Sequence, residues 1–202
     1  VFNILCTIIL FPFANQLEKL ACFIIRDAKV GDAEEILDTR LMATPSIALE
    51  QCKKVVKSMF EKTELGVVEA CNMLINYSDK TMEEVVSLEK KVDKYEDQLG
   101  TYLVQISKQN LSEQDSREVS EILHIIGDVE RISDHSVAIA KSAQEISGKK
   151  LKFSNQAEGE ITVMIKAVKE ILQESKNAFL EDDANLAMDV EAMERVIDKL
   201  KH

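Results

Sequence analysis

Apolar side chains recur at gaps of three and four residues through most of this chain, which is the spacing of one face of an α-helix. One such stripe covers residues 85–106 and a second covers residues 119–146. Because the spacing holds without interruption in both segments, the pattern predicts long amphipathic helices that each bury one face.

Capping residues mark where the predicted helices begin. Thr44 followed by Pro45 is typical of an N-cap and a first helical residue, and predicts a helix that ends near residue 76. Thr81 opens a capping box, and we expect its helix to reach residue 108. Three further helices are predicted, one capped by Ser112 and ending near Gly148, one opened by Ser154, and one capped by Asp182 or Asp183. Short turns make neighbouring helices antiparallel, so the predicted fold is all-α, an up-and-down helical bundle.

Part of the helical pattern occurs twice. Residues 85–96 align with residues 190–201 at an offset of 105 positions, with Val85/Val190, Glu89/Glu194, Asp93/Asp198 and Lys94/Lys199 identical. The repeat predicts a three-helix unit over residues 45–148 and two helices of a truncated second unit over residues 154–202. The third helix of the second unit would follow His202, and without it we expect the second core to be open.

The beginning of the chain does not follow the helical pattern. Residues 1–25 contain two short apolar runs, neither of which reaches the roughly 20 residues needed to span a bilayer. One interpretation is a helix buried against the rest of the domain. The interpretation that we favour is the end of a transmembrane helix followed by an interfacial segment, with Pro12 ending the span. Residues 26–44 are charged and without periodicity, and we expect a linker there.

The amino-acid composition favours a helical protein and argues against one that binds nucleic acid. Six Gly and two Pro leave few turn residues, which again favours long helices over sheets. A net charge of −11 argues against nucleic acid as a partner. The four cysteines, Cys6, Cys22, Cys52 and Cys71, are far apart and are predicted to be free and mostly buried thiols.

Paired carboxylates are the candidate chemistry. Glu89 with Asp93, and Glu130 with Asp134, each lie four residues apart and therefore on one face of their helix. Both pairs are predicted to lie beside the apolar stripe, on an exposed or groove-lining face. Four carboxylates from neighbouring helices could bind Mg, Ca, Mn or Fe. An acidic chain also produces such pairs by chance on solvated faces.

Other candidate sites are weaker. His135 follows Asp134 and could supply an imidazole, although an exposed histidine is the simpler interpretation. Glu121 and His124 form half of a ferritin-like di-iron motif, but a second such motif is missing. The sequence contains no Gly-rich phosphate loop and no nucleophile–base pair, so we predict that the protein is not an enzyme.

Two segments resemble a known family. Residues 127–135 (GDVERISDH) closely resemble the DLERIGDH signature of PhoU-type proteins, the helical regulators of bacterial phosphate uptake, and residues 88–96 (LEKKVDKYE) resemble the other acidic motif of that family. Residues 1–13, 37–41 and 44–50 look like the junction in bacterial sodium/phosphate cotransporters. In those proteins a membrane domain is followed by a cytoplasmic PhoU-like tail.

The resemblance implies a metal site. PhoU proteins bind multinuclear metal clusters, typically of iron or zinc, through paired acidic motifs, and Mg, Mn and Ca remain open here. The positions that match the motifs are Glu89, Asp93, Glu130 and Asp134, and in the second repeat Glu194 and Asp198. Ser133 replaces the usual glycine of the signature, a change that we expect to be tolerated.

The resemblance also implies a function. We expect a regulatory domain on the cytoplasmic side of the cell membrane, which modulates sodium-coupled phosphate uptake through contact with its own membrane transport domain. A homodimer is a further partner that the sequence leaves open. The alternatives are a free-standing PhoU-type regulator and a metal-free helical scaffold. The identity of the metal, the oligomeric state and the sign of the regulation stay open.

Overall fold

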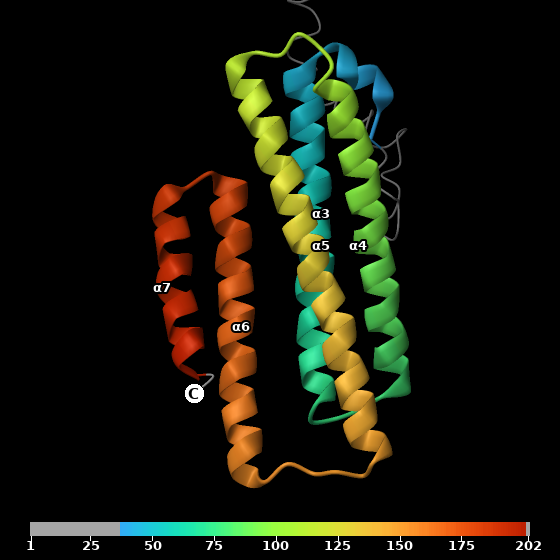
Figure 1. Cartoon of the computed structure of the whole chain (residues 1–202), viewed down its shortest axis with the longest axis vertical. Coiled ribbons are helices and arrows are strands. Elements are labelled where there is room, and N and C mark those ends of the chain that lie inside the picture. Colours follow the sequence, from blue (N-terminus) through green and yellow to red (C-terminus); the bar gives the residue numbers. More distant parts are fainter. Residues whose placement is uncertain (1–36, 201–202) are drawn as a thin grey trace, which may run out of the picture. The chain divides into compact units, whose positions relative to one another are not determined.

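The computed structural model describes residues 37–200, and every regular element in that range is a helix (Figure 1). The elements are η2 (Thr39–Ala43), α3 (Pro45–Met73), α4 (Asp79–Ile106), α5 (Glu113–Gly148), α6 (Asn155–Glu181) and α7 (Ala184–Leu200). The predicted all-α, up-and-down bundle is confirmed. The expectations for residues 1–25, and for the linker before residue 37, lie outside the described residues.

Serine side chains begin three of the long helices. Ser78, Ser112 and Ser154 each accept a hydrogen bond from the backbone N–H three residues further on, which satisfies a donor in the first turn. The predicted start of α4 was therefore wrong by three residues, because Ser78 rather than Thr81 is its N-cap. Thr44 is the N-cap of α3 as predicted, although its side chain makes no capping hydrogen bond.

Helices α3, α4 and α5 pack against one another and form what we call the first three-helix unit. Their apolar stripes meet in a core whose largest fully buried members include Leu49, Met59, Met73, Leu99, Leu103, Ile106, Ile122 and Ile126. The predicted stripe of α4 is confirmed, since Val85, Val92 and Leu99 have no exposed surface.

Helices α6 and α7 form a hairpin that we call the α6–α7 pair. Helix α6 packs along α3, where the rings of Phe60 and Phe179 lie 5.9 Å apart and the Lys176 Nζ lies 2.7 Å from Glu64 Oε2. No residue of α6 or α7 is buried. This agrees with the expectation of an open second core. The first residues of α4 and α7, Asp79 and Ala184, are also 105 positions apart, as the sequence repeat requires.

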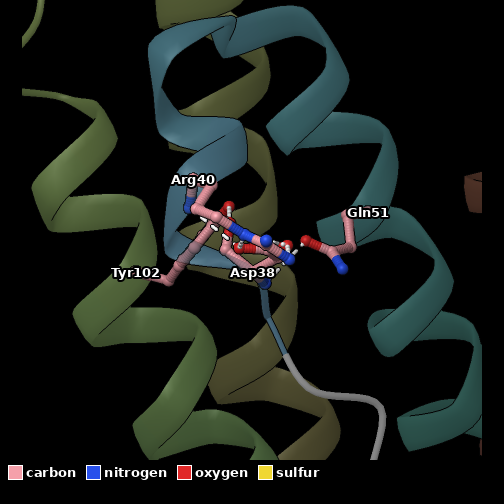
Figure 2. A network of polar contacts seen from close by, with 4 residues as sticks. All are labelled: Asp38, Arg40, Gln51 and Tyr102. Carbon is pink, nitrogen blue, oxygen red and sulfur yellow. Dashed lines mark hydrogen bonds and ion pairs between the residues drawn. The ribbon is translucent and has the colours of Figure 1, made fainter.

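A short 3-10 helix holds the chain against the bundle just before α3 (Figure 2). The Asp38 N–H donates a hydrogen bond to Gln51 Oε1 at 3.0 Å, and the Tyr102 hydroxyl donates to the Asp38 carbonyl at 2.8 Å. Arg40 pairs with the Asp38 carboxylate at 2.6 Å. Hydrogen bonds from the Arg40 side chain and backbone hold the pKa of Asp38 below its usual value.

Part of the predicted linker over residues 26–44 is thus a 3-10 helix that is docked on the bundle, which the lack of periodicity did not indicate. Leu37, Leu41 and Met42 pack against the core of the first three-helix unit. In the sequence these three apolar residues stand among charged ones, so no helical periodicity was visible there. Among the described helices, none has a stretch long and apolar enough to cross a membrane.

Candidate functional site

The predicted carboxylate pairs of the first three-helix unit lie on the neighbouring helices α4 and α5. Glu89 and Asp93 are on α4, and Glu130 and Asp134 are on α5. Each pair has one half-buried member, Glu89 or Glu130, and one exposed member. The predicted position beside the apolar stripe is confirmed for all four side chains, and we call this set, together with Glu96, the acidic edge.

Glu96 is the member of the acidic edge that sequence reasoning missed. It lies seven residues after Glu89 and three after Asp93, which is the same face of α4. This spacing was a usable signal, but the two-residue motif drew attention to Glu89 and Asp93 alone.

The carboxylates of the acidic edge lie close enough to shift one another's pKa values. Burial raises the pKa of Glu130 above its usual value, and the charges of Asp134, Glu96, Asp93 and Glu89 raise it further. Burial also raises the pKa of Glu96, with contributions from Asp97 and Asp93. Carboxylates on two helices therefore disfavour one another's charged forms. A cation or a basic surface placed here would relieve that repulsion.

The acidic edge has suitable donors for a metal, but they do not converge in this structure. Carboxylate oxygens suit hard cations such as Mg²⁺, Ca²⁺ and Mn²⁺. Within residues 37–200, no group of three or more Asp, Glu, His or Cys side chains is placed to hold one ion. The arrangement supplies a concentrated negative charge rather than a formed coordination sphere.

The carboxylates of the second repeat lie elsewhere. Glu194 and Asp198 are exposed on α7, which packs against α6. The structure does not bring them to the acidic edge on α4 and α5. The helix that would face them in a complete second unit corresponds to α5, and the described residues contain no such helix beside α7.

Two serines, one in the signature segment and one directly after it, are buried in the bundle. They are Ser133 and Ser136, and the Ser136 hydroxyl donates to the Ser133 carbonyl at 2.6 Å. A Cβ on Gly66 of α3 would lie 3.4 Å from the Ser136 Oγ, so small residues set a close approach of α3 and α5. Ile132 and Ile139 belong to the apolar stripe predicted over residues 119–146, but both are only half-buried. Thr63 of α3 is also buried, and its Oγ1 has no hydrogen-bond partner among the described residues.

The other candidate residues of the described part are three exposed side chains and two buried cysteines. Glu121, His124 and His135 are exposed. Cys52 and Cys71 are buried and free, as predicted, while Cys6 and Cys22 lie outside the described residues. Burial, with the charge of Glu118, raises the pKa of Cys52 to about 12, which makes its thiol a poor nucleophile at neutral pH.

Comparison with known families finds a match, and it falls on the first three-helix unit. Residues 56–143 match the family described as the PhoU domain. The matched segment runs from α3 through α4 to α5, so it includes the whole acidic edge. The similarity to the PhoU domain thus covers most of the first three-helix unit.

More particular similarity is to a set of enterobacterial proteins. The chain is 23% identical over 153 residues to the "Putative inorganic phosphate export protein YjbB" of Escherichia coli K12, and to the proteins of the same name from Shigella flexneri and E. coli O157:H7. The aligned region is 74% of this chain but only 27% of each relative. The chain thus spans about a quarter of the length of these relatives. No solved structure matches the chain.

Proposed function

We propose that this chain is the regulatory, PhoU-like part of a protein that moves inorganic phosphate across a membrane. The observation that carries the proposal is the PhoU match over residues 56–143. The similarity to relatives whose name refers to phosphate export supports it, since those relatives are much longer than the matched region. In the finer form of the proposal, the domain lies on the cytoplasmic side of the membrane and modulates sodium-coupled phosphate uptake.

The acidic edge is the part of the domain that we expect to act. A regulatory domain changes transport only if it binds two states of the transport domain with different affinity. The half-buried Glu130, surrounded by like charges on α4 and α5, is stabilised by a cationic partner surface. A transport state that presents basic side chains to the acidic edge would therefore be favoured over a state that withdraws them.

Phosphate flux in cells tests the proposal. The full-length gene product is expressed in bacteria without phosphate transporters of their own, and uptake and efflux of radiolabelled phosphate are followed in separate assays. Deletion of all residues from Pro45 onward is expected to change either the uptake rate or the efflux rate by about fivefold or more, at equal abundance in the membrane. Glu130→Gln/Asp134→Asn is expected to shift that rate in the same direction. Unchanged rates in both assays would reject the regulatory role.

Two further measurements separate the finer alternatives. Replacing sodium by potassium in the flux assay abolishes uptake if the transport is coupled to sodium. A reading frame without membrane-spanning segments upstream of residue 1 would reject the transporter-domain version. It would instead support a free-standing PhoU-type regulator, which the family match fits equally well.

Metal binding by the acidic edge stays a prediction. Elemental analysis of purified protein should find iron, zinc or another divalent metal, and Glu130→Ala/Asp134→Ala should lower its content. The matched control is Glu113→Ala/Glu145→Ala, which removes two exposed carboxylates of the same helix that lie outside the candidate motifs. Equal metal content in all three proteins would show that the acidic edge works without a bound metal, as in the scaffold alternative.

A further inference from the structure

A groove at one end of the first three-helix unit has no role in the proposed function. It lies where the turn between α3 and α4 meets the loop between α5 and α6, and its volume is about 420 Å³. Its floor includes Met73 and Ala143, which are buried members of the core. At its rim Leu151 is 59% exposed and Ile75 is 39% exposed. The groove is thus an apolar surface that is continuous with the core.

The same groove has a cationic rim in a chain whose net charge is −11. Lys149, Lys150 and Lys152 fall within four positions, and the last two line the groove. Lys149 pairs with Glu145 one turn earlier in α5. No carboxylate among residues 37–200 forms an ion pair with Lys150 or Lys152. Two ammonium groups are therefore free to meet an anionic partner beside an apolar floor.

The backbone conformation at Lys150 favours glycine, so it gives no reason for a lysine at this position. Lys150 adopts φ of 56°, the left-handed conformation at which helices usually end with glycine. The turn is closed by backbone hydrogen bonds, from the Lys150 N–H to the Ser147 carbonyl and from the Leu151 N–H to the Ile146 carbonyl. A glycine would close the same turn with less strain. What lysine adds at this position is its charge at the rim.

Charges at the same end of the bundle favour a small partner over a flat anionic membrane. Helix α4 begins beside the groove, and Asp79 accepts a hydrogen bond from Tyr77, which lines it. Asp79, Glu83 and Glu84 are all exposed there. An anionic bilayer that covered this end would meet these carboxylates as well as the lysines. A peptide segment can meet the lysines and avoid the carboxylates.

We propose that this groove docks an acidic peptide segment of a partner protein, in which carboxylates flank one large apolar side chain. The apolar side chain enters between Leu151 and Ile75, and the carboxylates pair with Lys150 and Lys152. The match of an apolar floor and a cationic rim to that pattern carries the proposal. It is independent of the acidic edge, none of whose residues lines the groove.

Peptide selection on the full chain tests this docking site. A random peptide library displayed on phage is selected against the wild-type chain, and the enriched sequences are synthesised with a fluorescent label. We expect them to share carboxylates next to a large aliphatic or aromatic residue. Lys150→Glu/Lys152→Glu is expected to weaken their binding by about tenfold. Leu151→Ser/Ile75→Ser is expected to weaken it similarly, with the helical circular dichroism of both variants unchanged.

The matched control is Lys54→Glu/Lys57→Glu, which reverses two exposed lysines of α3 and should leave peptide binding within about twofold. Failure to enrich any peptide, or equal binding to all variants, would overturn the proposal. Binding to phosphatidylserine-containing vesicles that is lost in Lys150→Glu/Lys152→Glu would assign the groove to lipid instead. A dimer in sedimentation that this variant dissociates would assign it to a second copy of the chain.

Discussion

The first three-helix unit and the α6–α7 pair have related sequences but very different burial. Val85 and Val92 of α4 are fully buried, whereas their equivalents Val190 and Ile197 of α7 are only half-buried. The spacing of apolar residues is the same in both helices. The difference is that α5 covers α3 and α4, and no described helix takes the equivalent place beside α6 and α7. An apolar stripe specifies a helix face, but the number of neighbouring helices decides how much that face stabilises the fold.

The largest expected effect comes from truncating equivalent core positions in the two regions. Val92→Ala should lower the free energy of unfolding by about 2 kcal/mol, because it removes methyl groups that are wholly buried. Ile197→Ala removes a larger side chain but should cost less than about 1 kcal/mol, because that side chain is half in water. Urea unfolding followed by circular dichroism measures both. Equal losses would mean that α7 is covered in solution by an element that the described residues lack.

The second prediction concerns the seam that joins the two regions. Lys176 and Glu64 pair at 2.7 Å with side chains only 17% and 21% exposed. Lys176→Met should cost about 1–2 kcal/mol, because it leaves the Glu64 carboxylate half-buried without its cation. Hydrogen exchange should speed up in α6 and α7 and stay unchanged in α4. If the amides of α4 exchange faster to the same extent, the two regions unfold as one cooperative unit and the distinction between them is lost.

Most of the fold could be predicted from the sequence because its determinants are local. Gaps of three and four residues gave the helices, and serine or threonine caps placed their beginnings within a few residues. The offset of 105 positions between Val85 and Val190 predicted the duplication, and α4 and α7 begin at that same offset. The docked segment around Asp38 was missed, since its hydrogen bond from Tyr102 joins residues 64 positions apart.

The candidate site was only partly predictable for a similar reason. Spacing placed Glu89 with Asp93 and Glu130 with Asp134, because each pair lies on one helix. Spacing also places Glu96 on the face of Glu89 and Asp93, but it cannot say that this face lies near the carboxylates of α5. Spacing also gave no sign that the polar Ser133 is buried.

The third prediction tests the segment that anchors the chain to the first three-helix unit. Tyr102→Phe removes the hydrogen bond to the Asp38 carbonyl and keeps the packing of the ring. The free energy of unfolding should fall by about 1 kcal/mol, and the amides of residues 38–43 should exchange faster. Tyr77→Phe is the control, because its hydroxyl bonds only to side chains that are exposed, those of Asp79 and Gln144. A loss no greater than the control's would show that apolar packing alone holds the segment.

The smallest expected effect is a pH dependence that is confined to the first three-helix unit. Burial and four neighbouring carboxylates raise the pKa of Glu130 in the folded protein above its unfolded value of about 4.5. The folded state therefore takes up the proton more readily, and this group's contribution to stability rises as pH falls from neutral through the folded pKa. Glu130→Gln should stabilise the protein by a few tenths of a kcal/mol at neutral pH, about the size of a like-charge repulsion on a helix, and that gain should shrink toward pH 5. Glu194→Gln on the exposed face of α7 is the control from the other region. If both substitutions give the same pH profile in urea unfolding, the crowding of carboxylates between α4 and α5 has no energetic consequence.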